Sequence, residues 1–263
     1  MKTSASSKTI ALLAALIAGL ATQLPAATVV LSNGNRIDGT DVRAMRNGDV
    51  VLSTPSGQRT FARGTYTKAI ADKPAAYDQA RSLAGQGRQD EAIGLLEDIA
   101  TQYRFLDWDN NALMAIAQIE SSRNNHAKAV ETYERLVSQS PELREESNVQ
   151  WAYRDALLKA GQHDKLTPSL DQAIKSGSRA DAARAQIMRG DIRMAKGEIE
   201  PAAMDYLRSA ILFENEKDVQ PEALLKAGQA LDKLRDPRAK DMYRRLVEGY
   251  PQSSQAQEAR ARM

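Results

Sequence analysis

Cysteine is absent from all 263 residues, so neither a disulfide nor thiol chemistry can contribute to the fold or to an activity. Histidine occurs only as His126 and His163, each in a polar turn without Asp, Glu or His at metal-ligand spacing. Aromatic residues make up 5% of the chain, and there is no Gly-x-Ser-x-Gly elbow and no glycine-rich phosphate loop. These absences predict that the chain has no catalytic residues, binds no metal ion or cofactor, and is not an enzyme.

The first 27 residues have the layout of a secretory signal peptide. Lys2 and Lys8 precede an uncharged run at residues 10–20, and Pro25, Ala26 and Ala27 offer small residues for cleavage. The run is shorter than the about 20 residues that a membrane span needs, although retention as an anchor stays open. No lipid-anchored cysteine can follow the leader. We therefore expect a periplasmic or otherwise exported protein without an integral membrane segment after cleavage.

The balance of charge gives no reason to expect a nucleic-acid partner. The chain has 36 basic and 34 acidic residues, and removal of Lys2 and Lys8 leaves 34 of each. The net positive charge thus belongs to the leader, and a near-neutral mature chain lacks the basic excess of nucleic-acid-binding domains.

Residues 28–71 are expected to form a small β module. Their β-prone clusters are separated by Asn33-Gly34, Asn47-Gly48 and Ser56-Gly57, and Asn-Gly favours the tight turns of hairpins. We predict four or five short antiparallel strands in an SH3-like or Sm-like module. Its basic residues outnumber its acidic ones, which is typical of a solvated face; contact with an anionic envelope polymer is the alternative.

From residue 72 onward the apolar pattern is helical and repeats every 36 or 37 residues. The anchors of the repeat are Ala92, Ala129, Leu166, Ala202 and Ala239. A fixed period of this length indicates stacked helical hairpins, in which no repeat buries its apolar face alone. The structural core is expected to include Ala92, Leu96, Ala129, Tyr133, Leu136, Leu170, Ala202, Tyr206, Ala239, Tyr243 and Leu246.

These residues resemble tetratricopeptide repeats. The second repeat carries the pattern as Ala117, Ala129, Tyr133, Leu136 and Pro141, and the fifth as Gly228, Ala239, Tyr243, Leu246 and Pro251. The third repeat departs from it at Leu166, and the first helix of the fourth is one position out of register. The resemblance implies a mainly α fold: a superhelical solenoid of about five repeats over residues 72–263, closed by a C-terminal capping helix.

The fifth repeat is also similar to repeats of bacterial envelope proteins, over residues 242–247 and 250–253. The proteins with this similarity are the Tol-Pal-associated periplasmic protein and the outer-membrane assembly lipoproteins. In the family, the first helix of each repeat lines a concave groove. The resemblance therefore implies a partner-binding groove formed by Tyr77, Arg81, Met114, Gln118, Trp151 and Asp155. Ile187 and Leu224 share this row but are expected in the core, and Trp108 is expected to pack over a repeat junction.

The expected function is that of an exported, non-enzymatic scaffold or adaptor that binds protein or peptide partners in the cell envelope. An alternative from another class is a cell-wall or surface-polysaccharide-binding protein, in which the β module binds the glycan and the solenoid is a spacer. Homo-oligomerisation stays open, and the residues do not specify the partner or the pathway.

Overall fold

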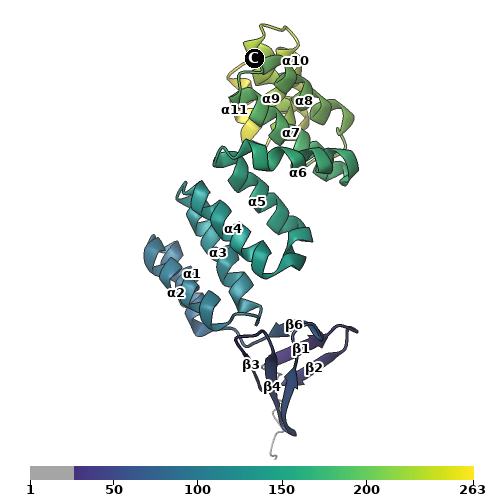
Figure 1. The fold of residues 1–263 in the computed structure, drawn as a ribbon. Helices are drawn as coiled ribbons and strands as arrows, with labels where there is room; N and C mark the ends of the chain where they lie inside the picture. The colour runs from purple at the N-terminus through teal and green to yellow at the C-terminus, as the bar shows by residue number, and fades with distance from the viewer. Residues whose placement is uncertain (1–26) are drawn as a thin grey trace, which may run out of the picture. The chain divides into compact units, whose positions relative to one another are not determined.

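The computed structural model describes residues 27–263, which divide into two compact units (Figure 1). The β unit comprises residues 27–74 together with Tyr103–Trp108, and the helical unit comprises Ala75–Gln102 and Asp109–Met263. The predicted signal peptide lies outside the described residues, apart from Ala27. Each unit is described below by itself.

Residues 27–70 form six strands, where the sequence predicted four or five. The strands are β1 (Ala27–Leu31), β2 (Arg36–Gly39), β3 (Asp41–Ala44), β4 (Val50–Thr54), β5 (Gly57–Phe61) and β6 (Tyr66–Ile70). They make two antiparallel sheets of three strands, in the orders β2-β1-β6 and β3-β4-β5. The additional strand arises because the chain bends at Thr40, between the end of β2 at Gly39 and the start of β3 at Asp41. Gly39 packs closely there: a Cβ on it would lie 2.3 Å from the Ser53 carbonyl oxygen.

The β unit includes a segment that is distant in sequence, Tyr103–Trp108. Leu106 is 4% exposed and packs in the core of the β unit with Val29, Leu52 and others. Trp108 Nε1 donates a hydrogen bond of 2.9 Å to the Ala71 carbonyl oxygen. This hydrogen bond joins Trp108 to the end of the β unit, and packing of Trp108 over a repeat junction stays a prediction. The helical domain is not the continuous stretch expected over residues 72–263, because this segment belongs to the β unit.

The helical unit is an array of antiparallel helix pairs (Figure 1). Its helices are α1 (Ala75–Gly85), α2 (Gln89–Gln102), α3 (Trp108–Ser122), α4 (His126–Gln139), η1 (Pro141–Glu145), α5 (Ser147–Lys159), α6 (His163–Ser176), α7 (Arg179–Ala195), α8 (Ile199–Leu212), α9 (Gln220–Lys233), α10 (Ala239–Gly249) and α11 (Ser254–Arg260). The short α11 packs against α9 and α10 and buries Ala256 and Ala259. It covers the end of the array, as the predicted capping helix would.

Small residues on the first helix of a pair accommodate tyrosine rings of the second. A Cβ on Gly190 of α7 would lie 2.5 Å from Tyr206 Cε1, and one on Gly228 of α9 would lie 2.4 Å from Tyr243 Cε1. All the residues predicted for the core are buried, and Tyr133, Tyr206 and Tyr243 are each at most 3% exposed. Close packing of this kind fixes the spacing of the two helices in a pair, because a core without voids tolerates little change of volume.

Candidate partner-binding surface

Two of the predicted groove residues, Arg81 and Gln118, line one cavity of about 240 Å³. They lie on α1 and α3, the first helices of adjacent repeats, at equivalent positions 37 residues apart. The cavity also presents Ser122 and an apolar lining of Ala84, Ala115 and Ile119, each half-buried. Both Arg81 and Gln118 are exposed, and neither side chain has a hydrogen bond or ion pair within residues 27–263. The cavity thus combines apolar surface with polar groups that are available to a ligand.

The other predicted groove residues are less accessible. Tyr77 and Met114 are half-buried on α1 and α3. Asp155 is half-buried on α5, and its carboxylate is paired with Lys159 one turn further along at 2.8 Å. Ile187 and Leu224, which share the row of Tyr77, are each 2% exposed and belong to the core.

Trp151 is enclosed by Arg154 of α5 and by Arg184 and Asp181 of α7, and these four residues are called the Trp151 clamp below. The Trp151 side chain is 6% exposed, and the guanidinium groups of Arg154 and Arg184 each lie 4.5 Å from the ring centroid. Trp151 Nε1 donates a hydrogen bond of 2.9 Å to Asp181 Oδ1. A partner that approached this position would therefore meet the two arginines, with the indole ring beneath them.

Asp181 anchors the clamp at the start of α7. The Ser178 hydroxyl accepts a hydrogen bond from the Asp181 main-chain N–H at 3.1 Å and donates one to its carboxylate at 2.7 Å. The Ser178 hydrogen bond, with help from Trp151, lowers the pKa of the Asp181 carboxyl below its ordinary value. The ionised form of Asp181 is therefore the form that the folded state prefers.

Acid should weaken this clamp. A carboxyl whose pKa is lowered on folding contributes stability above its unfolded pKa of about 4, and that contribution is lost as the pH falls through the folded pKa. We expect Asp181→Asn to unfold at lower urea concentration than the wild type at pH 7, and the difference to shrink below about pH 4. Urea titration across that range tests this.

Asp98 supplies the control for the pH experiment. It is an exposed acid on α2 with no hydrogen bond or ion pair in the described part of the chain. Asp98→Asn should leave the urea midpoint nearly unchanged at both pH values. If Asp181→Asn behaved in the same way as Asp98→Asn, the proposed role of the Asp181 carboxylate would be wrong.

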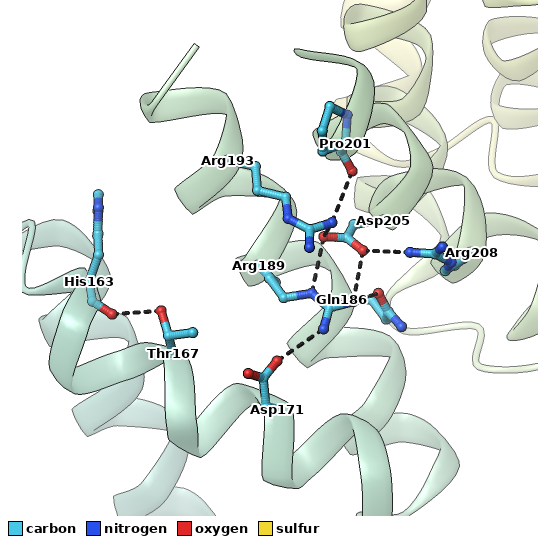
Figure 2. Close-up of polar contacts among 9 residues, drawn as sticks. All are labelled: His163, Thr167, Asp171, Gln186, Arg189, Arg193, Pro201, Asp205 and Arg208. Atoms are coloured by element: carbon cyan, nitrogen blue, oxygen red, sulfur yellow. Dashed lines mark hydrogen bonds and ion pairs between the residues drawn. The ribbon is translucent and has the colours of Figure 1, made fainter. Parts of the chain in front are cut away.

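A buried carboxylate, Asp205, lies at the centre of a cluster between α6, α7 and α8 (Figure 2). Its side chain is fully buried, and Arg189 donates to it from two nitrogens, at 3.1 and 2.9 Å. Arg193 and Arg208 pair with it at 2.7 and 3.1 Å. Arg189 also reaches Asp171 on α6 at 3.0 Å. The hydrogen bonds to Asp205 raise the pKa of the Arg189 guanidinium, so the charged pair is stable.

This cluster was not predicted, although the sequence contained a signal for it. Asp205 lies between Ala202, Tyr206 and Ser209 on the buried face of α8, where an acid needs a partner. A cavity of about 260 Å³ beside the cluster is lined by Arg189, Arg193 and Lys196 together with Asp171 and Glu198. Because these charges largely neutralise one another, the cluster is best explained as a link between α7 and α8, the two helices of the fourth pair, with one further ion pair from Arg189 to α6.

The described residues supply no group of three or more His, Cys, Asp or Glu that could hold a metal ion. His126 begins α4, and its Nδ1 is buried without a hydrogen bond within residues 27–263. His163 begins α6, where its carbonyl oxygen accepts a hydrogen bond from Thr167. Over the same residues, no helix combines the length and the apolar character that a membrane span requires.

Two family models for the tetratricopeptide repeat match the chain, one over residues 77–143 and 155–219 and the other over residues 222–253. No curated relative matches it in sequence. Among solved structures, MamA from Desulfovibrio magneticus RS-1 aligns with a TM-score of 0.51 at 14% identity, over 69% of this chain and 99% of that one. YrrB, a TPR protein with an unusual peptide-binding site, aligns with a TM-score of 0.46 at 13% identity, over 71% of this chain and 90% of that one.

Proposed function

We propose, since this chain belongs to the tetratricopeptide repeat family, that its helical unit is a scaffold that holds a protein or peptide partner. The observation that carries this proposal is the cavity lined by Arg81 and Gln118. It lies at the first helices of two adjacent repeats, and its polar groups are not used within the described part of the chain. A site of this form suits a short segment of a partner chain.

The chemistry of the cavity indicates how such a segment would bind. Gln118 offers both an amide donor and a carbonyl acceptor, which match the main-chain groups of an extended peptide. Arg81 offers a planar guanidinium to a carboxylate or carbonyl oxygen. Ala84, Ala115 and Ile119, which are half-buried, give apolar surface for one side chain of the partner. Because the packed helices fix the backbone at these positions, only the side chains must be ordered on binding.

The finer parts of the proposal concern location and chemistry. We place the scaffold outside the cytoplasm, in the cell envelope, on the strength of the signal-peptide pattern in residues 1–27. We also propose that it acts by binding and without catalysis, as the composition suggests. The polysaccharide-binding alternative has no observation in its favour and is not proposed.

Photo-crosslinking in living cells tests the scaffold and its location together. A photoreactive phenylalanine in place of Gln118 should crosslink to a specific protein, and Arg81→Ala should reduce the yield. The crosslinked product should appear in the exported fraction of the cells. Recovery from the cytosol would contradict export, while leaving the scaffold proposal standing.

The control places the same photoreactive residue at Glu131, an exposed position on α4, the second helix of its pair. Glu131 has no hydrogen bond or ion pair within residues 27–263, so its replacement should not disturb the fold. Equal crosslinking from positions 118 and 131, or none from position 118, would contradict the proposed site.

A further inference from the structure

The surface of the β unit carries three arginines whose guanidinium groups lie over phenylalanine rings. Arg59 lies 5.4 Å from the ring centroid of Phe61 on the same strand. Arg63 and Arg104 lie 5.3 and 4.8 Å from the ring centroid of Phe105. Stacking on an aromatic ring holds a guanidinium in a defined plane, while its N–H groups remain able to donate.

The guanidinium groups of these three arginines are exposed and have no ion pair or hydrogen bond within residues 27–263, although the Arg63 main-chain N–H donates to the Asp49 carboxylate at 2.9 Å. The β unit as a whole has eight basic and five acidic residues over residues 27–74 and 103–108, which gives a net charge of +3. The helical unit has 26 basic and 29 acidic residues, so the positive excess is confined to the β unit.

The backbone that presents Phe105 is held in a strained conformation. Phe105 and Asp107 have φ values of 69° and 70°, in the left-handed region that costs a non-glycine residue roughly 1–2 kcal/mol. Burial of Leu106 and the 3.0 Å ion pair of Asp107 with Lys68 hold this turn in place. Strain of this kind persists where the surrounding structure enforces it, and it concentrates at binding sites.

The arrangement favours one class of ligand. The ring of Phe105 is covered by two guanidinium groups, and Phe61 is 8% exposed in the core of the β unit. The rings are therefore poorly placed to stack on a nucleic-acid base. What the surface offers at Phe105 is two planar cations, which match the geometry of carboxylates and phosphates. Because the proposed partner is a protein, the carboxylates of acidic side chains are the ligand that we choose.

We propose that Arg63 and Arg104, which share the ring of Phe105, form a docking surface for an acidic segment of a protein partner. This proposal rests on the proposed scaffold function, because it assumes that the partner is a protein. The surface is a different one from the cavity lined by Arg81 and Gln118. Several separated carboxylates, as in a run of Glu or Asp, would each pair with one stacked guanidinium.

The test uses the protein without its predicted signal peptide, residues 28–263. Binding of fluorescein-labelled decaglutamate is measured by fluorescence anisotropy at low ionic strength. Arg63→Gln and Arg104→Gln should each weaken binding about tenfold, the loss expected for one charge-assisted contact. Arg104→Lys should fall between wild type and Arg104→Gln, because it keeps the charge but loses the flat stacking group. Binding should decline as salt is added.

The matched control is Arg36→Gln. Arg36 is an exposed arginine of the same unit, on β2, without a ring contact, ion pair or hydrogen bond of its side chain in the described residues. Its variant should bind decaglutamate within about twofold of wild type, since an isolated exposed charge contributes little. Equal losses for Arg36→Gln and Arg104→Gln would reduce the surface to diffuse positive charge and overturn the proposal.

Two further outcomes decide the ligand class and separate this proposal from the scaffold site. Absence of decaglutamate binding, or tighter binding of polyphosphate of equal charge, would overturn the assignment to an acidic peptide. Loss of decaglutamate binding in Arg104→Gln with unchanged crosslinking from position 118 would support two independent surfaces. Loss of crosslinking in Arg81→Ala with unchanged decaglutamate binding would support the same conclusion.

Discussion

Replacing Asp205 by alanine should lower the free energy of unfolding by about 3–5 kcal/mol, the usual cost of removing one partner from a buried ion pair. Asp205 is fully buried, whereas the side chains of Arg189, Arg193 and Arg208 are 19, 30 and 42% exposed. Most of this destabilisation should come from Arg189. It donates to Asp205 from two nitrogens, and of the three arginines it is the least able to replace those hydrogen bonds with water. Urea unfolding followed by circular dichroism measures the effect.

Asp171→Ala is the control for this measurement, because it removes the other carboxylate that pairs with Arg189. The Asp171 side chain is 54% exposed, so its ion pair is screened by solvent and should contribute less than about 1 kcal/mol. The ratio between the two variants tests whether burial, rather than the presence of an ion pair, determines the stability of this link. Similar losses for both variants would contradict that interpretation.

The repeat period predicted the helical fold well because the residues that pack between the two helices of a pair recur at a nearly constant spacing in the sequence. Tyr206 must lie against a residue without a side chain, and Gly190 stands 16 positions earlier. The fifth pair uses Gly228 and Tyr243 in the same way, 15 positions apart. In these two pairs the spacing reflects packing, because the tyrosine of the second helix lies against the glycine of the first.

The segment around Leu106 could not be predicted in the same way. Leu106 belongs to no repeated pattern, and its partners Val29 and Leu52 lie more than fifty residues earlier. An apolar residue in a turn between helices is consistent with many contacts, and the sequence gives no spacing that selects one. The hydrogen bond of Trp108 to Ala71 could not be predicted for the same reason, since it spans 37 residues without a motif at either end.

The accessibility of groove residues was predictable only in part. Arg81 and Gln118 follow from the period, because polar residues at equivalent positions of adjacent first helices share one face. The burial of Trp151 depends instead on where Arg154 and Arg184 direct their long side chains. Long side chains can lie over an apolar ring or extend into water, and the helical pattern does not distinguish these conformations.

Tyr206→Ala is the second substitution for which a large effect is expected, a loss of about 3–5 kcal/mol from the cavity left by the ring. The ring is 2% exposed, and the hydroxyl donates a hydrogen bond of 2.8 Å to Asp191, which also accepts from Lys226 of α9 at 2.6 Å. Tyr206→Phe keeps the ring and removes one hydrogen bond, so it should cost only about 1 kcal/mol. Urea unfolding distinguishes the contribution of the ring from that of the hydroxyl.

The contact between Tyr206 and Gly190 can be tested because Gly190→Ala should change the free energy of unfolding in opposite directions with and without the tyrosine ring. In the wild type, Gly190→Ala forces a methyl group against the ring and should destabilise the protein by about 1–3 kcal/mol. In the Tyr206→Ala background the ring is absent, so the same change should stabilise by up to about 1 kcal/mol through helix propensity. Gly94→Ala on α2, where a Cβ meets no atom within 4 Å, should stabilise in both backgrounds. If Gly190→Ala had the same effect in both backgrounds, the ring would not be what excludes a side chain at Gly190, and the packing that spaces α7 and α8 would need another explanation.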